Sequence, residues 1–234
     1  MISLFTKFNK INRDYLFTDK HIHTNWIHAK NNVTEIIDRA RQIGLNQIAI
    51  TEHCRKESSF YRAFYEEVVQ KRNDKTDIQI IIGNESKIYD YNGSLDISDE
   101  IKKLSEFKIG SVHNIPVDGK FYKPKILGKK ICQDLELKLT KAALKNEDID
   151  VIGHVGGQSL KYYGSFPMEY FEDIIMCCLK HDKAFDLNYT YHNKIINSLK
   201  PLLAKYNPYV SLGSDAHKLD YIGKWIEARD ILLW

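Results

Sequence analysis

The stretch TDKHIHTNWIHAKN, residues 18–31, places Asp19, His21, His23 and His28 within ten positions, although the whole chain of 234 residues has nine histidines. Its KHIHT segment indicates a short β-strand. Alternate residues of a strand point to the same side, so His21 and His23 can bind one metal ion together. The stretch therefore predicts a strand that ends at a metal site, with His28 in the loop that follows.

Outward from this stretch, strand-like and helix-like segments alternate along the chain. In residues 32–44, for example, Ile36, Ile37 and Ala40 lie at helical spacing, and Gly44 is a helix-stop signal. Strands are expected at residues 20–24, 46–51, 78–83, 107–111, 149–154, 184–188 and 209–214. Helices are expected at residues 32–44, 60–72, 132–146, 168–182 and 193–206 and in the tail 218–234, and residues 86–98 indicate a hairpin that turns at Asn92–Gly93.

Seven strands separated mostly by helices indicate parallel βα units. Because the pattern contains no polar edge strand, we expect the sheet to close into a (β/α)7 TIM-like barrel. A chain of 234 residues that is 43% hydrophobic can bury the core of such a barrel as a single domain. Barrels of this type build their active sites at the C-terminal ends of the strands.

Composition excludes several classes of protein. The formal charge of +3 suits an anionic substrate but is too small and too dispersed to favour nucleic acid binding. No apolar run reaches the roughly 18 residues of a membrane span, and the N-terminus lacks the pattern of a signal peptide. Cys54, Cys132, Cys177 and Cys178 show no C-x-x-C spacing, so we expect reduced thiols and a cytoplasmic protein.

Metal-type side chains follow almost every expected strand. Because parallel strands of a barrel end on one face, these side chains are expected to converge there. They include seven of the nine histidines. In chain order they are His21, His23, His28, His53, Glu85, His113, His154, Asp215 and His217.

A single histidine after a strand is more often a hydrogen-bonded structural residue than a metal ligand. Five consecutive strands that each end in histidine or glutamate, with a further group after the last strand, argue against that interpretation here. The two other histidines lie elsewhere: His181 ends a helical segment, and His192 begins one. Both are expected to be structural.

The residue types indicate the chemistry. Imidazole combined with carboxylate suits zinc, iron or manganese, and the absence of cysteine from the set argues against a thiolate-rich structural site. Eight or nine ligands are too many for one ion and enough for two or three. Polynuclear sites of this kind can promote in-line displacement at phosphorus, so the concentration of histidines indicates catalysis.

The motifs DKHIHTNW, TEH, GNE, SVH, GHVGG and GSDAH, in this order, resemble those of the PHP (polymerase and histidinol phosphatase) superfamily, and SVHN and GSDAHKLDYIGKWIEA are most similar to its histidinol-phosphatase-like branch. The similarity extends from about residue 19 to the C-terminus. It implies a distorted (β/α)7 barrel at residues 19–234, preceded by an N-terminal extension at residues 1–18. The family typically carries three metals and hydrolyses phosphate esters.

Carried over residue by residue, the resemblance implies three sets of ligands. His28 departs from the pattern, because many relatives have an aspartate in its place. The first metal would be held by His21, His23, Glu85 and Asp215; the second by Glu85, His113 and His154; and the third by His28, His53 and His217. Asp19 and Glu52 flank the ligands and are expected to accept hydrogen bonds from histidine N–H groups.

The expected activity is a metal-dependent phosphatase that acts on a small phosphate monoester, such as histidinol phosphate, through a hydroxide bridging two divalent metals (Zn, Mn or Fe). Glu85 would bridge the metals, Arg55 is a candidate clamp for phosphate, and Asp215 or a nearby histidine would protonate the leaving group. A phosphodiesterase or nuclease and a non-catalytic, metal-stabilised binding domain are the alternatives. The substrate, the native metal and the oligomeric state stay open.

Two further segments border the expected site. The lysine-rich loop at residues 120–130 could attract anionic substrates, although a run of charge is usually only solvated. The segment QSLKYYGSFP, residues 158–167, could form an aromatic lid.

Overall fold

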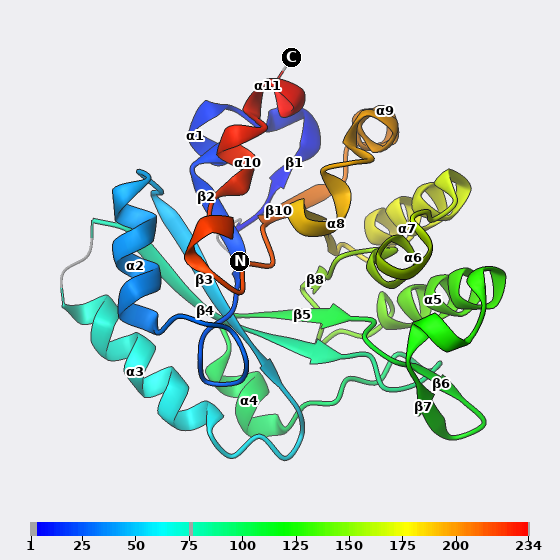
Figure 1. The fold of residues 1–234 in the computed structure, drawn as a ribbon, viewed down its shortest axis with the longest axis horizontal. Helices are drawn as coiled ribbons and strands as arrows, with labels where there is room; N and C mark the ends of the chain where they lie inside the picture. The colour runs from blue at the N-terminus through cyan, green and yellow to red at the C-terminus, as the bar shows by residue number, and fades with distance from the viewer. Residues whose placement is uncertain (1–3, 75–76, 234) are drawn as a thin grey trace.

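The computed structural model describes residues 4–74 and 77–233, and Figure 1 shows a curved central sheet with helices around its outside. Seven strands of this sheet are parallel, as expected, and lie in the order β10-β9-β8-β5-β4-β3-β2. They are β2 (Thr18–Ile22), β3 (Gln47–Cys54), β4 (Gln79–Lys87), β5 (Phe107–Ser111), β8 (Val151–Ile152), β9 (Ala184–Asn188) and β10 (Tyr209–Gly213).

The two ends of the sheet approach each other through β2 and β10. Ile22 and Ala216 form an isolated parallel bridge, in which the His23 amide donates to the Ala216 carbonyl at 2.9 Å. The connection is limited to this bridge, because β1 (Thr6–Lys7) pairs antiparallel with β10 on its outer edge. The fold is therefore a distorted TIM-like barrel, as expected, in which the last pair of strands forms no continuous ladder.

Helices follow the strands and cover the outer face of the sheet (Figure 1). Helix α2 illustrates the cause: Asn32 and Glu35 form a capping box at its start, and its apolar residues, Val33 and Ile36 among them, are buried. The longer helices are α2 (Val33–Gln42), α3 (Tyr61–Asn73), α4 (Asp99–Leu104), α5 (Lys129–Ala143), α6 (Gly157–Tyr163), α7 (Met168–Lys180) and α9 (Ile196–Tyr206). Four-residue helices are α1 (Arg13–Leu16), α8 (Tyr189–His192), α10 (Lys224–Glu227) and α11 (Arg229–Leu232), and 3-10 turns are η1 (Phe8–Lys10), η2 (Pro124–Ile126) and η3 (Leu219–Tyr221).

The connections differ in part from the expectation. Residues 86–98 form a tight turn rather than a full hairpin: Ile88 and Leu95 make one antiparallel bridge, and the Asp90 carboxylate accepts the amides of Asn92 and Ser94. An unexpected hairpin of β6 (Ile115–Val117) and β7 (Lys120–Tyr122) leads into the lysine-rich segment, and only its second strand lies within that segment. The tail forms two short helices in place of one, with Gly223 and Ala228 as their N-caps.

The barrel interior changes from apolar to polar along the strands. Ala49, Ile81 and Val151 lie toward the starts of their strands and are buried together in one apolar cluster. Toward the C-terminal ends the buried residues are charged or polar, such as His21 and Glu85. The polar residues at the strand ends therefore form the unusual part of the core.

Among the described residues no helix is long and apolar enough to cross a membrane.

Candidate metal centre

The C-terminal ends of the strands bring all nine expected metal-type side chains to one face of the barrel. His21 belongs to β2, His53 to β3 and Glu85 to β4. The others lie within a few residues of a strand end, except His28, which returns from the turn after β2. They are His23, His28, His113, His154, Asp215 and His217.

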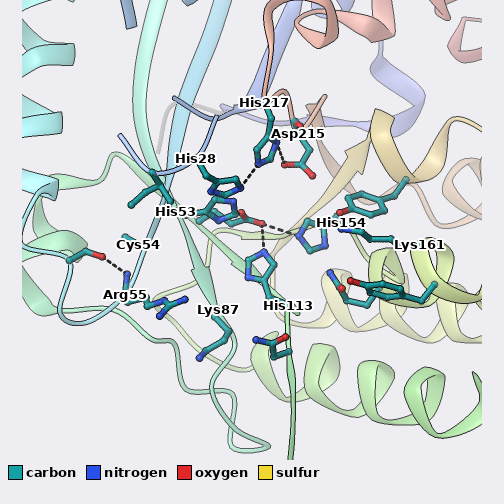
Figure 2. A pocket seen from close by; sticks show the side chains of 17 residues that line it. His28, His53, Cys54, Arg55, Lys87, His113, His154, Lys161, Asp215 and His217 are labelled. Atoms are coloured by element: carbon teal, nitrogen blue, oxygen red, sulfur yellow. Dashed lines mark hydrogen bonds and ion pairs between the residues drawn. The ribbon is translucent and has the colours of Figure 1, made fainter. Parts of the chain in front are cut away.

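Glu85 lies at the middle of this cluster. Its carboxylate is fully buried and surrounded by five imidazoles from four other segments of the chain, and dashed lines in Figure 2 mark its contacts with His113 and His154. The distances to its oxygens are 2.7 Å from His53 Nδ1, 3.0 Å from His154 Nε2, 3.4 Å from His113 Nε2, 3.5 Å from His21 Nε2 and 3.6 Å from His23 Nε2.

Asp215 supplies a second carboxylate on the side of β10. Its Oδ1 lies 3.1 Å from His23 Nε2 and 3.8 Å from His21 Nε2. Asp215 and His154 both have positive φ, 57° and 25°, a conformation that is uncommon outside glycine. The chain therefore bends sharply just after β8 and β10, at the two residues that turn toward Glu85, and such strain is concentrated at functional sites.

His28, His53 and His217 form the outermost part of the cluster. The Nε2 atoms of His28 and His217 are 3.0 Å apart, and the rings of His28 and His53 stack with centroids 4.9 Å apart. Figure 2 shows all three side chains pointing to the same region. His28, although exposed, is directed toward the cluster and not into solvent.

The donor set fits metal ions. Among the described residues, several fully buried side-chain atoms have no hydrogen-bond partner, and most of these atoms belong to the cluster: His21 Nε2, both ring nitrogens of His23, both oxygens of Glu85 and His154 Nδ1. Buried polar atoms are normally satisfied, so an unsatisfied group of imidazoles and carboxylate is typical of a metal site.

Three overlapping groups of residues could each hold an ion, because the ligand atoms within each group lie within 4.8 Å of one another. His23, His53 and Glu85 each belong to two of them. The groups are His21 with His23 and Glu85; His53 with Glu85 and His113; and His23 with His53 and His217. The shared residues suit a centre that would hold more than one ion, with Glu85 available to two of them.

Electrostatic interactions shift the pKa values of the central groups. Burial alone would raise the pKa of Glu85, but the surrounding His113, His53 and His21 hold it well below its usual value. Burial would lower the pKa of His23, but its contacts with Asp215, Glu52 and Glu85 raise it to about 9. For His53, burial and the neighbouring His23 lower the pKa to about 4. Metal ions would take the place of the protons that now balance this charge.

Asp186 is the functional candidate that sequence reasoning missed. It lies on β9, fully buried, and its Oδ2 accepts from His21 Nδ1 at 3.0 Å and from the His154 amide at 3.0 Å. The signal was present: AFDLN places a charged residue inside an otherwise apolar strand. Asp186 orients His21 so that its Nε2 faces Glu85.

The two acidic residues expected to accept histidine N–H groups do so only in part. Asp19 accepts backbone amides instead, those of Ser214 at 3.0 Å and Gly223 at 2.8 Å, and so fixes the segment around Asp215. Glu52 accepts the amide and hydroxyl of Thr24, and its Oε1 lies 3.8 Å from His23 Nδ1. Both acids therefore position the loops that carry the ligands.

The cluster opens into a cavity of about 600 Å³. Arg55 lies on its wall, where its backbone amide donates to Ser58 Oγ. Of the expected aromatic lid, Tyr162 lines the cavity, whereas Phe166 is buried in the core. None of the lysines at residues 120–130 lines it.

The two histidines expected to be structural lie outside the cluster. His192 is buried, its Nε2 lies 2.8 Å from the Val155 carbonyl oxygen, and its Nδ1 accepts the Asn188 amide at 3.1 Å. His181 lines a separate cavity together with Phe5 and Tyr209.

Comparison with known proteins agrees with this arrangement. The sequence model of the PHP domain matches residues 19–212. Probable phosphatases of Caldicellulosiruptor saccharolyticus and Caldicellulosiruptor bescii are 30% and 28% identical, covering 87% and 90% of this chain and 81% and 83% of the relatives. The fold is shared with the histidinol phosphate phosphatase of Lactococcus lactis, whose crystal structure contains Zn, L-histidinol and phosphate (TM-score 0.71, 20% identity, 92% of each chain).

Proposed function

Because the chain belongs to the PHP domain family, we propose that it is a metal-dependent phosphatase that hydrolyses a small phosphate monoester, such as histidinol phosphate or a similar metabolite. The observation that carries this proposal is the buried Glu85 carboxylate with five imidazoles around it at the base of an open cavity. Clusters of this composition hold transition metals, and polynuclear metal sites promote displacement at phosphorus.

The proposed ligand sets are those that the family resemblance implies. His21, His23, Glu85 and Asp215 would hold one ion; Glu85, His113 and His154 a second; and His28, His53 and His217 a third. Bound there, divalent zinc, manganese or iron supplies positive charge for the phosphoryl oxygens and lowers the pKa of a coordinated water.

The residues of the chain have separate tasks in this proposal. Arg55, on the wall of the cavity, binds the phosphate and keeps it in line with the cluster. Asp186 and Glu52 hold the histidines in the required orientation. Asp215, which lines the cavity, or a nearby histidine such as His217, whose Nδ1 lies 3.6 Å from the Asp215 carboxylate, is the proposed source of the proton for the leaving alkoxide.

The test is a substrate screen with protein purified under mild conditions and analysed for metal. We expect elemental analysis to approach three transition-metal equivalents and the loaded protein to release phosphate from small monoesters. Histidinol phosphate is the first substrate to assay, with a dinucleotide and single-stranded DNA as diester controls. Release of nucleotides from DNA without phosphate release from any monoester would support a nuclease instead. Activity on neither class would leave a metal-stabilised binding domain.

A further inference from the structure

The charged residues on the cavity wall are distributed unevenly. Among the residues that the structure describes, the acidic ones that line the cavity of about 600 Å³ are Glu85 and Asp215, and both belong to the proposed metal cluster. The remaining charged residues on its wall, histidines aside, are all cations: Arg55, Lys87 and Lys161. Outside the metal centre, the wall therefore presents positive charge alone to a bound molecule.

Two of these cations are not neutralised by neighbours. Lys87 Nζ lies 3.5 Å from an oxygen of Asp96, which offsets part of its charge. Within residues 4–74 and 77–233, neither Arg55 nor Lys161 forms an ion pair with a carboxylate; the contact recorded for Lys161 is with the ring of Tyr162, 5.6 Å away. These two charges are available to a ligand.

Arg55 and Lys161 lie on opposite sides of the cluster. Figure 2 shows Arg55 beside Lys87 on the side of β3 and β4, and Lys161 on α6 beyond His154. Lys161 also lines an adjoining cavity of about 360 Å³, to which Lys218 and Tyr221 contribute. The positive wall thus continues outward from Lys161, away from Arg55.

Because Arg55 and Lys161 lie on opposite sides of the cluster, the phosphate group and the organic part of a bound monoester would each face a different one of them. In the proposed function, the phosphate group contacts the metal cluster and Arg55, and the organic part extends along the opposite wall. There it meets Lys161 with Tyr162 and Tyr191. An ammonium group on the organic part would face a lysine and find no free carboxylate, whereas an anionic group would be attracted.

We propose that Lys161 selects substrates whose organic part carries a second anionic group, a carboxylate or another phosphate, and disfavours substrates with a cationic organic part. This inference rests on the proposed function and narrows its substrate class. Within the proposed class of small monoesters, amino alcohol phosphates such as histidinol phosphate would then be hydrolysed more slowly than monoesters with an anionic organic part.

The size of the effect follows from exposure. Lys161 is exposed, so its interaction with one anion is worth about 1 kcal/mol or less, about fivefold in affinity. With the more distant cations added, we expect a preference of about tenfold for an anionic over a neutral organic part. The preference should shrink at high salt, because exposed charges are screened.

Three unreactive phosphonates test this preference without turnover. 3-Phosphonopropionate, propylphosphonate and 2-aminoethylphosphonate share an ethylphosphonate unit and end in a carboxylate, a methyl and an ammonium group. Titration calorimetry on the zinc-loaded protein should give the lowest Kd for the carboxylate and the highest for the ammonium compound. Equal Kd values, tightest binding of the ammonium compound, or no binding of any of them would overturn the proposal.

Variants locate the preference at Lys161. Lys161→Met should reduce the carboxylate-to-methyl ratio of Kd values about fivefold, and Lys161→Arg should retain the ratio. Lys180→Met removes the same charge from an exposed position on α7 and should leave the ratio unchanged. If Lys161→Met weakens all three phosphonates by the same factor, Lys161 contacts the phosphate group and the proposal is wrong.

Turnover separates this inference from the proposed function. Phosphate release from 3-phosphoglycerate should exceed release from glycerol 3-phosphate, and release from phosphoethanolamine should be lowest. Comparing 3-phosphoglycerate with a sugar bisphosphate then distinguishes the two kinds of anion. If the phosphonates bind in the expected order but no monoester is hydrolysed, the phosphatase assignment fails and the anion selectivity stands. If monoesters are hydrolysed at rates that do not depend on the charge of the organic part, the phosphatase assignment stands and the proposed anion selectivity fails.

Discussion

At the scale of single residues, Glu85 connects more of the site than any other side chain. Histidines from β2, β3 and the segments after β5 and β8 converge on its two oxygens. The negative charge of Glu85 stabilises the protonated form of His21 beside it, although burial alone would favour the neutral forms of both groups.

Replacing Glu85 by glutamine should therefore separate catalysis from folding. Glu85→Gln preserves size but removes the charge shared between two proposed ions, so we expect turnover to fall by about three orders of magnitude, equivalent to about 4 kcal/mol. Circular dichroism should show an unchanged fold. Glu57→Gln, in the exposed loop after β3, is the control and should retain full activity. Near-normal turnover of Glu85→Gln would contradict the bridging role.

His28 tests whether the third group of ligands exists. Its Nε2 is 3.0 Å from His217 Nε2, a distance at which both nitrogens can face one ion. His28→Ala should lower the metal content by about one equivalent and reduce turnover more than stability. His181→Ala, far from the cluster, should leave the metal content unchanged. An unaltered metal content in His28→Ala would show that His53 and His217 bind without it.

Asp186 tests the orientation of His21. Asn in its place can keep the hydrogen bond from one partner but loses the charge that supports the histidine, so Asp186→Asn should weaken zinc affinity about 10- to 100-fold. Competition with a chromogenic chelator measures this change. Asp182→Asn, exposed in the turn before β9, is the matched control. Equal zinc affinities of the two variants would remove Asp186 from the site.

At the scale of elements, the packing of β10 against β2 sets the position of the first two histidines. Gly213 ends β10, and a Cβ built on it would lie 2.5 Å from His21 Cβ and 2.7 Å from Asp186 Oδ1. Only glycine permits this approach of the strands, because both neighbouring atoms belong to buried side chains. The metal site therefore depends on a residue that has no ligand atom.

Gly213→Ala should damage both stability and the site. Because the neighbours must move, we expect a loss of about 1–3 kcal/mol in the free energy of unfolding and weaker zinc binding. Urea denaturation of the metal-free protein and chelator competition measure the two effects. Gly119→Ala, where a Cβ meets nothing but φ is 75°, should cost about 1 kcal/mol through strain alone and leave zinc affinity intact. Normal zinc affinity of Gly213→Ala would show that β2 and β10 can separate without loss of the site.

At the scale of the whole molecule, the proposed metal centre would join both ends of the sheet. Its proposed ligands come in part from β2 and from the segment after β10, which meet through the bridge of Ile22 and Ala216. Ions bound between His21, His23 and Asp215 would add cross-links where the ladder is weakest. Metal binding should therefore stabilise the barrel as a whole.

The stabilisation by zinc should increase with pH. In the metal-free protein the pKa of His23 is raised to about 9, so its protonated form contributes stability that is fully present below about 6.5 and is lost as pH rises through 9. Metal binding requires the unprotonated ring and improves over the same range. The increase in Tm on zinc loading should therefore be larger at pH 8 than at pH 6. A difference that is independent of pH would show that His23 does not exchange a proton for metal.

The sequence by itself determined the order of the elements and the residues that could form a site. The spacing of apolar residues and the helix-stop signals predicted the seven parallel strands, because both are local properties of the chain. The β6–β7 hairpin and helices α1, α4 and α6 were not predicted, and β4, β8, the turn at residues 86–98 and the tail differed in extent. The histidines and acids stood out because their positions after strands do not depend on how those strands pack. The resemblance to the PHP superfamily is confirmed by the match over residues 19–212.

Tertiary structure alone decided how these side chains meet. The sequence could not show that Asp186 holds His21, that Asp19 binds backbone amides, or that Gly213 leaves space for both, because each contact joins residues more than 25 positions apart. It also could not show which lysines face the cavity: the run at residues 120–130 does not line it, whereas Lys161 on α6 does. The sequence gives the sign of each charged side chain but not the surface that the side chain faces, because that depends on how the helices pack on the barrel.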